Sequence, residues 1–191
     1  MSPNIITIDQ VASTPWLNGG GSTRELVTWP APDDWSLRIS VAEISRDGPF
    51  SAYPGVQRWF AVLDGAGVRL RLPDRMVKLT PDNPPLEFDG AATPGCALLE
   101  GPTRDLNLML KADRAEGRMS VVQPGIAHVE ASRLRAVFTC DDARLQIDGE
   151  PAITLPAMSL AWTPQGARQS WKLTNKRGRV RAFWIDAQPL P

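Results

Sequence analysis

The chain is poor in the residues on which metal binding and nucleophilic catalysis usually depend. It has one histidine, His128, which lies outside any cluster with ligand spacing. Histidine-rich metal sites and Ser-His-Asp or Cys-His arrangements are therefore not expected, and we predict no metal and no cofactor. Its two cysteines, Cys96 and Cys140, are too few for a disulfide framework. We expect two buried thiols, although the sequence leaves a single bridge open.

The chain also lacks an excess of charge and a long apolar run. Lysine and arginine together number 21, as do aspartate and glutamate, so the formal net charge is zero. No field of one sign would gather a polyanion, which argues against nucleic acid as a partner. No apolar window of about 18 residues occurs, and the first residues carry no basic segment followed by an apolar one. We therefore expect a cytoplasmic protein with no membrane partner.

Little of the sequence runs uninterrupted for long enough to form a helix of several turns. The chain has 18 prolines and 15 glycines, and Asp-Gly turn signals recur along it. Residues 7–13 are the one modest helix candidate. Between the turn signals lie short apolar runs that are typical of strands, at 35–44, 58–65, 68–72, 96–101 and 105–110. These features predict an all-β, antiparallel sandwich or barrel.

The order of elements repeats along the chain. Residues 58–111 and 134–185 each begin with a strand and a tight turn, pass through a proline-containing stretch and end in further strands. We predict two halves, residues 1–115 with the polar motifs and residues 116–191, a smaller half that has no comparable polar cluster and supports the fold. The polar stretch 111–125 then forms the join, unless it is a long surface loop inside one domain.

The first polar motif surrounds three consecutive glycines at 19–21. It contains Asn18, Thr23, Arg24 and Glu25, and the glycines expose backbone N–H groups that an anionic or carbonyl ligand can accept from. It is not a phosphate loop, because no Gly-Lys-Ser/Thr opens a helix here. The alternative interpretation is a tight turn.

The second motif is the turn-rich segment from Asp47 to Arg58, which also contains Ser51. It leads directly into a strand, so the Arg58 side chain can be held in a fixed orientation. The planar guanidinium matches a carboxylate through two hydrogen bonds. The alternative is that Arg58 pairs with Asp47 and holds the turn, and the two interpretations can coexist.

The third motif is the run Asp-Leu-Asn-Leu-Met-Leu. Strand alternation places Asp105, Asn107 and Met109 on one face and the leucines on the other. The strand at 35–42 divides in the same way, with Arg38 and Ser40 on its mixed face. If the apolar faces pack against a neighbouring layer, the mixed faces line a lumen for one small ligand. The alternative is that they meet solvent.

Together these segments resemble the HutD/Ves family. The resemblance covers roughly residues 15–110 and is carried by WLNGGGSTREL, SLRISVAEI, DGPFSAYPGVQRWFAVLDG, LEFDG and DLNLML. It implies a bicupin, with two cupin-like antiparallel β-barrel or jelly-roll halves, that lacks the usual metal ligands. It also implies a link in some bacteria to histidine-utilisation genes, where the family is proposed to bind an intermediate such as N-formylglutamate as a governor of flux or expression.

The residues and the resemblance give one set of expected ligand-binding positions. Leu106 and Tyr53 are mild departures from the family pattern and would alter the shape of the pocket rather than remove it. The expected ligand-binding residues are Asn18, Thr23, Arg24, Arg38, Ser40, Asp47, Ser51, Arg58, Asp105, Asn107 and Met109.

Three functions compete at this stage. The leading hypothesis is a protein that binds a small anionic metabolite without turnover. The alternative is a metal-independent cupin enzyme, a hydrolase or isomerase that uses Asp47 or Asp105 as the base. The third is a scaffold with a filled lumen and an exposed apolar patch. A homodimer is compatible with each of them.

Overall fold

The structure is a computed structural model that describes residues 2–165 and 168–190. Its elements are β-strands, and no α-helix occurs within these ranges. The helix candidate at 7–13 is a 3-10 turn, η1 (Ile8–Gln10), and a second such turn is η2 (Gly90–Ala92). In the described part of the chain no helix is long and apolar enough to cross a membrane. The predicted all-β class is confirmed.

The chain forms two compact units. The first unit is Val11–Ala115, and the second combines residues 2–10 with residues 116–190. Residues 2–10 were expected in the first half, but strand β1 (Asn4–Thr7) pairs with β17 (Ser159–Thr163) in the second unit, where Ile5 lies opposite Ala161. Backbone pairing with a distant strand leaves no local signal, so the sequence misassigned these residues.

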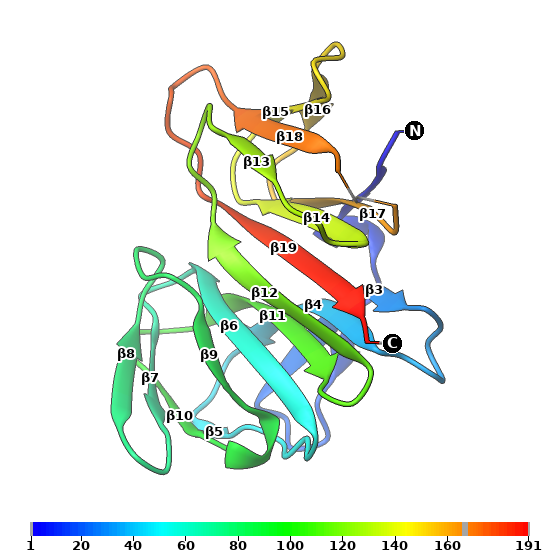
Figure 1. Ribbon diagram of the computed structural model, residues 1–191. Coiled ribbons are helices and arrows are strands. Elements are labelled where there is room, and N and C mark those ends of the chain that lie inside the picture. The colour runs from blue at the N-terminus through cyan, green and yellow to red at the C-terminus, as the bar shows by residue number, and fades with distance from the viewer. Residues whose placement is uncertain (1, 166–167, 191) are drawn as a thin grey trace. The chain divides into compact units, whose positions relative to one another are not determined.

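The first unit contains a six-stranded and a four-stranded antiparallel sheet (Figure 1). The larger one has the order β2 (Thr14–Pro15), β3 (Gly21–Trp29), β4 (Leu37–Ile44), β11 (Thr103–Lys111), β6 (Val56–Asp64), β9 (Leu86–Asp89). The smaller one has the order β5 (Gly48–Pro49), β10 (Gly95–Leu98), β7 (Val68–Arg71), β8 (Met76–Leu79).

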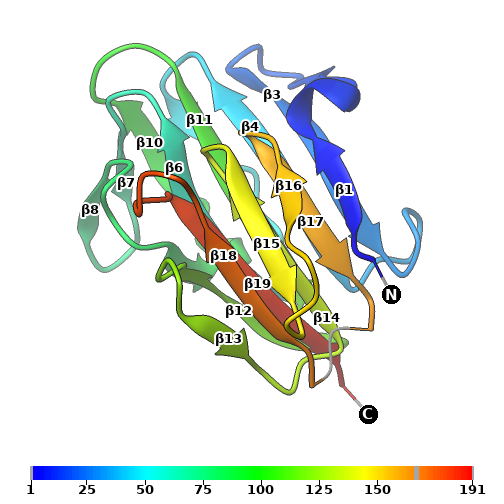
Figure 2. The ribbon, with the colours of Figure 1, turned by 90° about the horizontal axis from the view of Figure 1, so that it is seen from above.

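The second unit contains a five-stranded and a four-stranded antiparallel sheet, labelled in Figure 2. The larger one has the order β1, β17, β14 (Leu134–Thr139), β19 (Ala182–Pro189), β12 (Ala115–Val121). The smaller one has the order β13 (Ala127–Val129), β18 (Ser170–Thr174), β15 (Ala143–Ile147), β16 (Ile153–Leu155).

The two units repeat one topology. The orders β4-β11-β6-β9 and β5-β10-β7-β8 in the first unit recur as β12-β19-β14-β17 and β13-β18-β15-β16 in the second. Each strand from β4 to β11 therefore has a counterpart eight strands later. Eight is also the number of strands in a jelly roll, which consists of two Greek keys. The structure confirms two cupin-like jelly rolls, although each keeps two separate sheets and does not close into a barrel.

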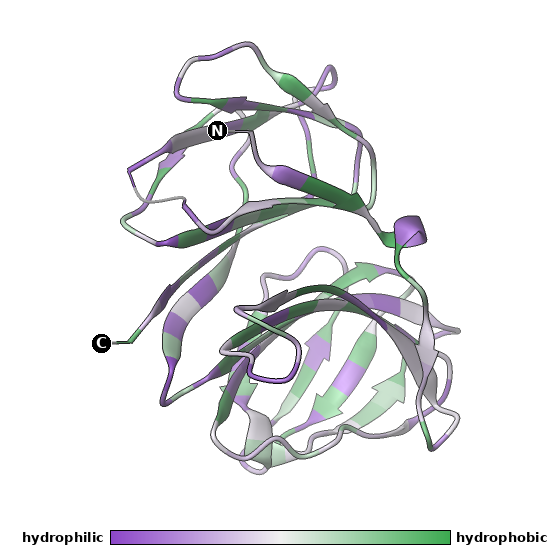
Figure 3. Ribbon diagram, turned by 90° about the vertical axis from the view of Figure 1, so that its right-hand side faces the viewer, coloured by the Kyte–Doolittle hydropathy of each residue, from purple (hydrophilic) through white to green (hydrophobic). Residues whose placement is uncertain are grey.

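In the first unit one face of the larger sheet carries both apolar core residues and polar side chains. Ile44, Phe60 and Val62 belong to a buried cluster between the sheets, completed by residues such as Leu70 and Phe88. On the same strands, hydrophilic positions interrupt the hydrophobic ones, which Figure 3 shows as purple segments among green. Cys96 and Cys140 are both buried, and no disulfide joins them.

Candidate functional site

A cavity of about 550 Å³ opens within the first unit. This volume lies in the usual range of small-ligand pockets. Strands β3, β4, β6 and β11 form much of its wall, and the segments around residues 14–18 and 49–53 complete it. Among the predicted residues, those that line it are Asn18, Thr23, Arg38, Ser40, Ser51, Arg58, Asn107 and Met109.

Sheet register brings the two lining arginines to either side of one strand. Because β11 lies between β4 and β6, Met109 is opposite Arg38 on one side and opposite Arg58 on the other. One pleat further along, Asn107 is opposite both Ser40 and Phe60. The side chains of these two rows lie on the same face of the sheet. The mixed faces therefore line a cavity and do not form an open outer surface of the sheet.

Arg58 is a buried cation whose hydrogen-bonding capacity is mostly unused. Only 7% of the residue is exposed. Its Nη2 donates to Oδ1 of Asn107 at 3.0 Å, while Nε and Nη1 have no partner among the residues that the structure describes. No carboxylate of residues 2–165 or 168–190 forms an ion pair with it. Asp47 therefore does not hold Arg58, since its Oδ1 accepts instead from the backbone N–H of Leu98 at 2.9 Å.

Aromatic rings surround the Arg58 guanidinium. Its central carbon lies 5.2 Å from the ring centroid of Phe50, 5.6 Å from that of Tyr53 and 5.1 Å from that of Phe88. Cation–π contacts of this kind compensate only part of the lost hydration. The pKa of Arg58 is lowered to about 10, chiefly by burial; Tyr53 opposes the change, and the charge of Arg38 makes a smaller contribution in the same direction as burial. The charged form is thus held in an unfavourable environment when the cavity contains no anion.

Arg38 differs from Arg58 because it has a carboxylate partner. Its Nη1 donates to Oε1 of Glu25 at 3.3 Å, and its Nη2 lies 3.0 Å from the sulfur of Met109. The guanidinium also stacks on the rings of Trp35 at 5.2 Å and Tyr53 at 5.3 Å. The Arg38 side chain is 18% exposed and that of Glu25 is 49% exposed, so this pair lies nearer to solvent than Arg58.

In the glycine-rich motif the N–H groups of Gly19 and Gly20 are hydrogen-bonded within the turn and are not free for a ligand. The N–H of Gly19 donates to the carbonyl of Trp16 at 3.0 Å, and that of Gly20 donates to Oδ1 of Asn18 at 2.9 Å. A Cβ on Gly21 would lie 2.2 Å from the carbonyl oxygen of Glu43, so only glycine fits. The tight-turn interpretation is the correct one, and Trp16, Leu17 and Asn18 line the cavity from this turn.

Three predicted residues do not line the cavity. Arg24 donates from Nη1 to the carbonyl of Val11, and Asp47 holds the turn at Leu98. Asp105 shares the face of Asn107 but is fully buried beyond it. Its Oδ2 accepts from Thr103 Oγ1 at 2.8 Å, and its Oδ1 has no partner within the described ranges. Burial raises the pKa of Asp105 to about 8, so it is mostly protonated at neutral pH.

Sequence reasoning missed most of the aromatic and apolar lining. Phe60 follows Arg58 at strand spacing, so alternation could have placed it in the lumen. Glu25 was noted in the first motif but not among the expected ligand-binding residues, because its partner Arg38 lies on a neighbouring strand. The additional lining residues are Thr14, Pro15, Trp16, Leu17, Glu25, Ala42, Ile44, Pro49, Phe50, Tyr53 and Phe60.

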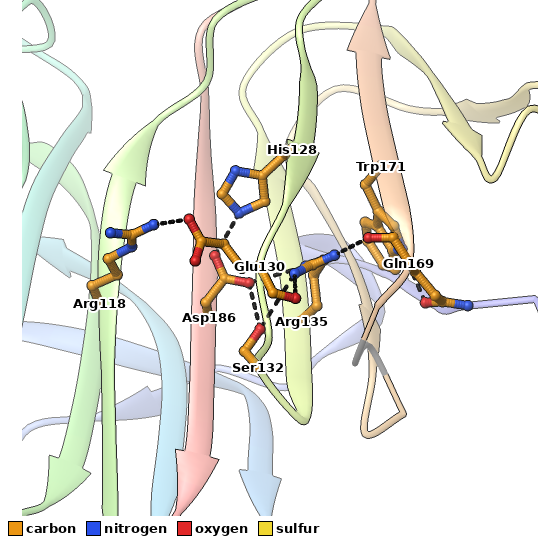
Figure 4. Close-up of polar contacts among 8 residues, drawn as sticks. All are labelled: Arg118, His128, Glu130, Ser132, Arg135, Gln169, Trp171 and Asp186. Carbon is orange, nitrogen blue, oxygen red and sulfur yellow. Dashed lines mark hydrogen bonds and ion pairs between the residues drawn. The ribbon is translucent and has the colours of Figure 1, made fainter.

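The second unit contains a buried polar network, contrary to the prediction that it has no comparable cluster (Figure 4). Arg135 on β14 is fully buried, and its Nε donates to Oδ1 of Asp186 on β19 at 3.0 Å. Its Nη1 and Nη2 donate to the backbone carbonyls of Gln169 and Glu130. The sequence missed this network because its members lie far apart along the chain.

Asp186 is the centre of that network. It also accepts from Ser132 Oγ and contacts Nε2 of His128, each at 2.6 Å. The imidazole stacks on Trp184, with ring centroids 4.5 Å apart, so the lone histidine is a half-buried structural residue. Burial raises the pKa of Asp186, but the hydrogen bonds from His128, Ser132 and Arg135 outweigh this effect and the net pKa is lowered.

No group of three or more His, Cys, Asp or Glu side chains that could hold a metal ion was found in the described part of the chain.

Comparison with protein families gives one match that covers most of the chain. The family model described as HutD matches residues 9–180. An uncharacterized 21.2 kDa protein in the hutC 3' region of Pseudomonas putida is 38% identical over 112 residues, which is 55% of this chain and 56% of that protein. Protein Ves of Citrobacter koseri is 35% identical over 108 residues, 56% of each chain. The match therefore spans little more than half the length of these curated relatives.

Solved structures match over nearly the whole chain. A conserved protein of unknown function from Pseudomonas aeruginosa PAO1 has a TM-score of 0.89 at 26% identity and covers 98% of this chain and 100% of its own. HutD from Pseudomonas fluorescens SBW25, described in a formate condition, has a TM-score of 0.85 at 26% identity, with coverage of 98% and 99%. A variant of oxalate decarboxylase from Bacillus subtilis shares the fold at 10% identity, with a TM-score of 0.66 over 98% of this chain and 77% of its own.

Proposed function

The chain belongs to the HutD family, and from that premise we propose that its first unit binds a small anionic metabolite through a carboxylate group paired with Arg58. The observation that carries this proposal is a buried guanidinium with two unused donor nitrogens in a cavity. A buried charge without a partner is costly, and a carboxylate supplies both the opposite charge and two acceptor oxygens.

The second unit supports this assignment from within the same chain. Arg58 lies on β6 and Arg135 on the counterpart strand β14, and each bonds to a side chain on the next strand of its sheet. In the second unit that partner is the carboxylate of Asp186. In the first unit it is the neutral amide of Asn107. The two arginines hold different register positions, since Asp186 lies directly opposite Arg135 whereas Asn107 lies opposite Phe60. What the second unit contributes is an example of a buried arginine that takes a carboxylate partner, and at Arg58 an external anion would supply one.

The composition of the cavity wall favours binding over catalysis. The proposed alternative, a hydrolase or isomerase, would use Asp47 or Asp105 as its base. Neither residue lines the cavity, and each is engaged elsewhere by Leu98 or Thr103. Glu25 does line it but is paired with Arg38. A protein that binds its ligand without turnover fits these contacts better.

The names of the relatives suggest the pathway in which this binding would act. One relative is encoded in a hutC 3' region and another is named HutD, with a structure described in a formate condition. We propose that the metabolite is a carboxylate of histidine utilisation, with N-formylglutamate as one candidate, and that binding regulates this pathway.

Calorimetric titration with formate, urocanate, glutamate and N-formylglutamate tests the proposal. We expect one of them to bind saturably without being consumed, as followed by NMR of the ligand. Arg58→Met should weaken that binding by about 2–5 kcal/mol, or roughly 30-fold to several thousand-fold. Arg104→Met is the matched control, because Arg104 is exposed and does not line the cavity. If Arg58→Met weakens ligand binding by less than tenfold, Arg58 is not the residue that anchors the carboxylate.

A further inference from the structure

We propose that the cavity selects a ligand with a single negative charge, and that Glu25 sets this limit by pairing with Arg38. This inference rests on the proposed function and specifies its ligand class. The ligand would be a monocarboxylate whose carboxylate pairs with Arg58 and whose second polar group is neutral. Urocanate has this form, whereas N-formylglutamate carries two carboxylates, so the inference removes it from the candidates named above.

The first argument is the charge balance of the lining. Its charged side chains are Glu25, Arg38 and Arg58, and two positive charges and one negative charge leave one positive charge. A single carboxylate cancels that charge. A ligand with two carboxylates would leave one negative charge uncompensated in a partly desolvated site, which is unfavourable.

The charged groups around the lining do not alter this balance. An adjoining cavity of about 200 Å³ adds Arg46 and Asp47, whose charges cancel. Asp105 is held protonated at neutral pH, because burial raises its pKa to about 8. Asp34 and Arg114 form an exposed ion pair. The ammonium of Lys111 lies 4.8 Å from the ring centroid of Trp35, outside the lining, where water and salt screen its charge.

The second argument is the difference between the two arginines. Arg58 lacks a carboxylate, whereas Arg38 already binds Glu25 at 3.3 Å. A second ligand carboxylate directed at Arg38 would have to displace Glu25 and then lie beside it. Two carboxylates that share one cation repel each other. Glu25 therefore excludes the second anion.

The same pair can receive a neutral group. Nε of Arg38 is a buried donor without a partner among residues 2–165 and 168–190, and the Glu25 carboxylate is an acceptor that is 49% exposed. A carboxamide or hydroxyl offers both an acceptor and a donor. Such a group satisfies Arg38 and Glu25 without breaking their ion pair.

The test compares dicarboxylates with their own monoamides, which differ by one charge at nearly constant size. The four pairs are oxalate and oxamate, malonate and malonamate, succinate and succinamate, and glutarate and glutaramate, titrated calorimetrically at pH 7. In the pair of best-fitting length we expect the monoamide to bind at least tenfold tighter. Tighter binding of the dicarboxylate overturns the inference and leaves the proposed carboxylate site standing.

If formate binds and none of the eight larger compounds does, the inference is also overturned, because the cavity then accepts no second polar group. The proposed carboxylate site would still stand. If no carboxylate binds at all, the proposed function fails and the inference fails with it.

The variant Glu25→Gln tests the residue itself. Without its negative charge the lining carries two positive charges, so the preference for the monoamide should fall at least tenfold. Glu43→Gln is the matched control, since Glu43 also lies on a strand of this sheet, is 55% exposed and pairs with an arginine, Arg104, but does not line the cavity. An unchanged preference in Glu25→Gln overturns the role of Glu25. If this variant does not fold, the wild-type comparison still decides the charge class.

Discussion

Replacing Asn107 with aspartate should give Arg58 a carboxylate partner from the protein itself. Oδ1 of Asn107 lies 3.0 Å from Nη2 of Arg58, and the change from amide to carboxylate barely alters the size of the side chain. The variant would give Arg58 a carboxylate partner on the next strand, as Asp186 is for Arg135 in the second unit. We expect Asn107→Asp to stabilise the ligand-free protein and to abolish carboxylate binding.

The magnitude follows from the state of Arg58. Burial lowers its pKa to about 10, well below that of a guanidinium in water, and the difference corresponds to a penalty of about 3 kcal/mol. That penalty bounds what a new partner can recover. A charge-assisted hydrogen bond exceeds a neutral one by about 1–2 kcal/mol. For a chain of this size we expect the unfolding midpoint to rise by about 2–8 °C.

The loss of affinity comes from repulsion. A ligand carboxylate about 5 Å from the new aspartate would meet an unfavourable energy of about 3 kcal/mol at an effective dielectric constant of about 20. Affinity should therefore fall by at least roughly a hundredfold. Thermal unfolding and calorimetric titration at pH 7 measure the two effects on the same sample.

The control is Asn83→Asp, which adds the same charge to an exposed turn of the first unit. It should leave both quantities nearly unchanged. A lower midpoint in Asn107→Asp together with unchanged affinity would refute the reasoning, because Arg58 would then need no carboxylate and would not be the anchor.

Two further predictions concern buried carboxyl groups. Asp105→Asn should flatten the pH dependence of the free energy of unfolding. Because the pKa of Asp105 is raised to about 8 in the folded state, its contribution to stability is fully present below about pH 4 and is lost as pH rises through 8. Urea unfolding of both proteins between pH 4 and 8 measures the difference. Asp186→Asn leaves Arg135 without its carboxylate and should cost about 3–5 kcal/mol at pH 7. Because the folded pKa of Asp186 is lowered, its wild-type contribution is present above about pH 4 and is lost in acid as pH falls through the folded value, so acid unfolding of both proteins should converge.

The fold could be predicted because its signals are local. Turn residues recur between short alternating runs, and neither needs knowledge of distant partners. The mixed face of Asn107 and Met109 followed from alternation alone. The placement of residues 2–10 in the second unit depends on pairing of β1 with β17, and no local pattern encodes that contact.

The site was only partly predictable for the same reason. Arg58 was identified because an arginine that directly follows a rigid turn is a local pattern, and it indicates a guanidinium held in a fixed orientation. The ion pair of Glu25 with Arg38 depends on the pairing of β3 with β4. The burial of Asp105 depends on the strands on either side of β11, which the local sequence does not reveal. The residues around Asp186 are likewise far apart along the chain and meet only in the folded unit.

The repeated topology has a consequence for the history of this chain. A duplication that yields two jelly rolls begins with two equivalent sites, and selection then acts on each separately. In the second unit, Trp171 and Trp184 fill part of the interior. In the first unit a cavity of about 550 Å³ remains, so the two repeated units have diverged in how their interiors are filled.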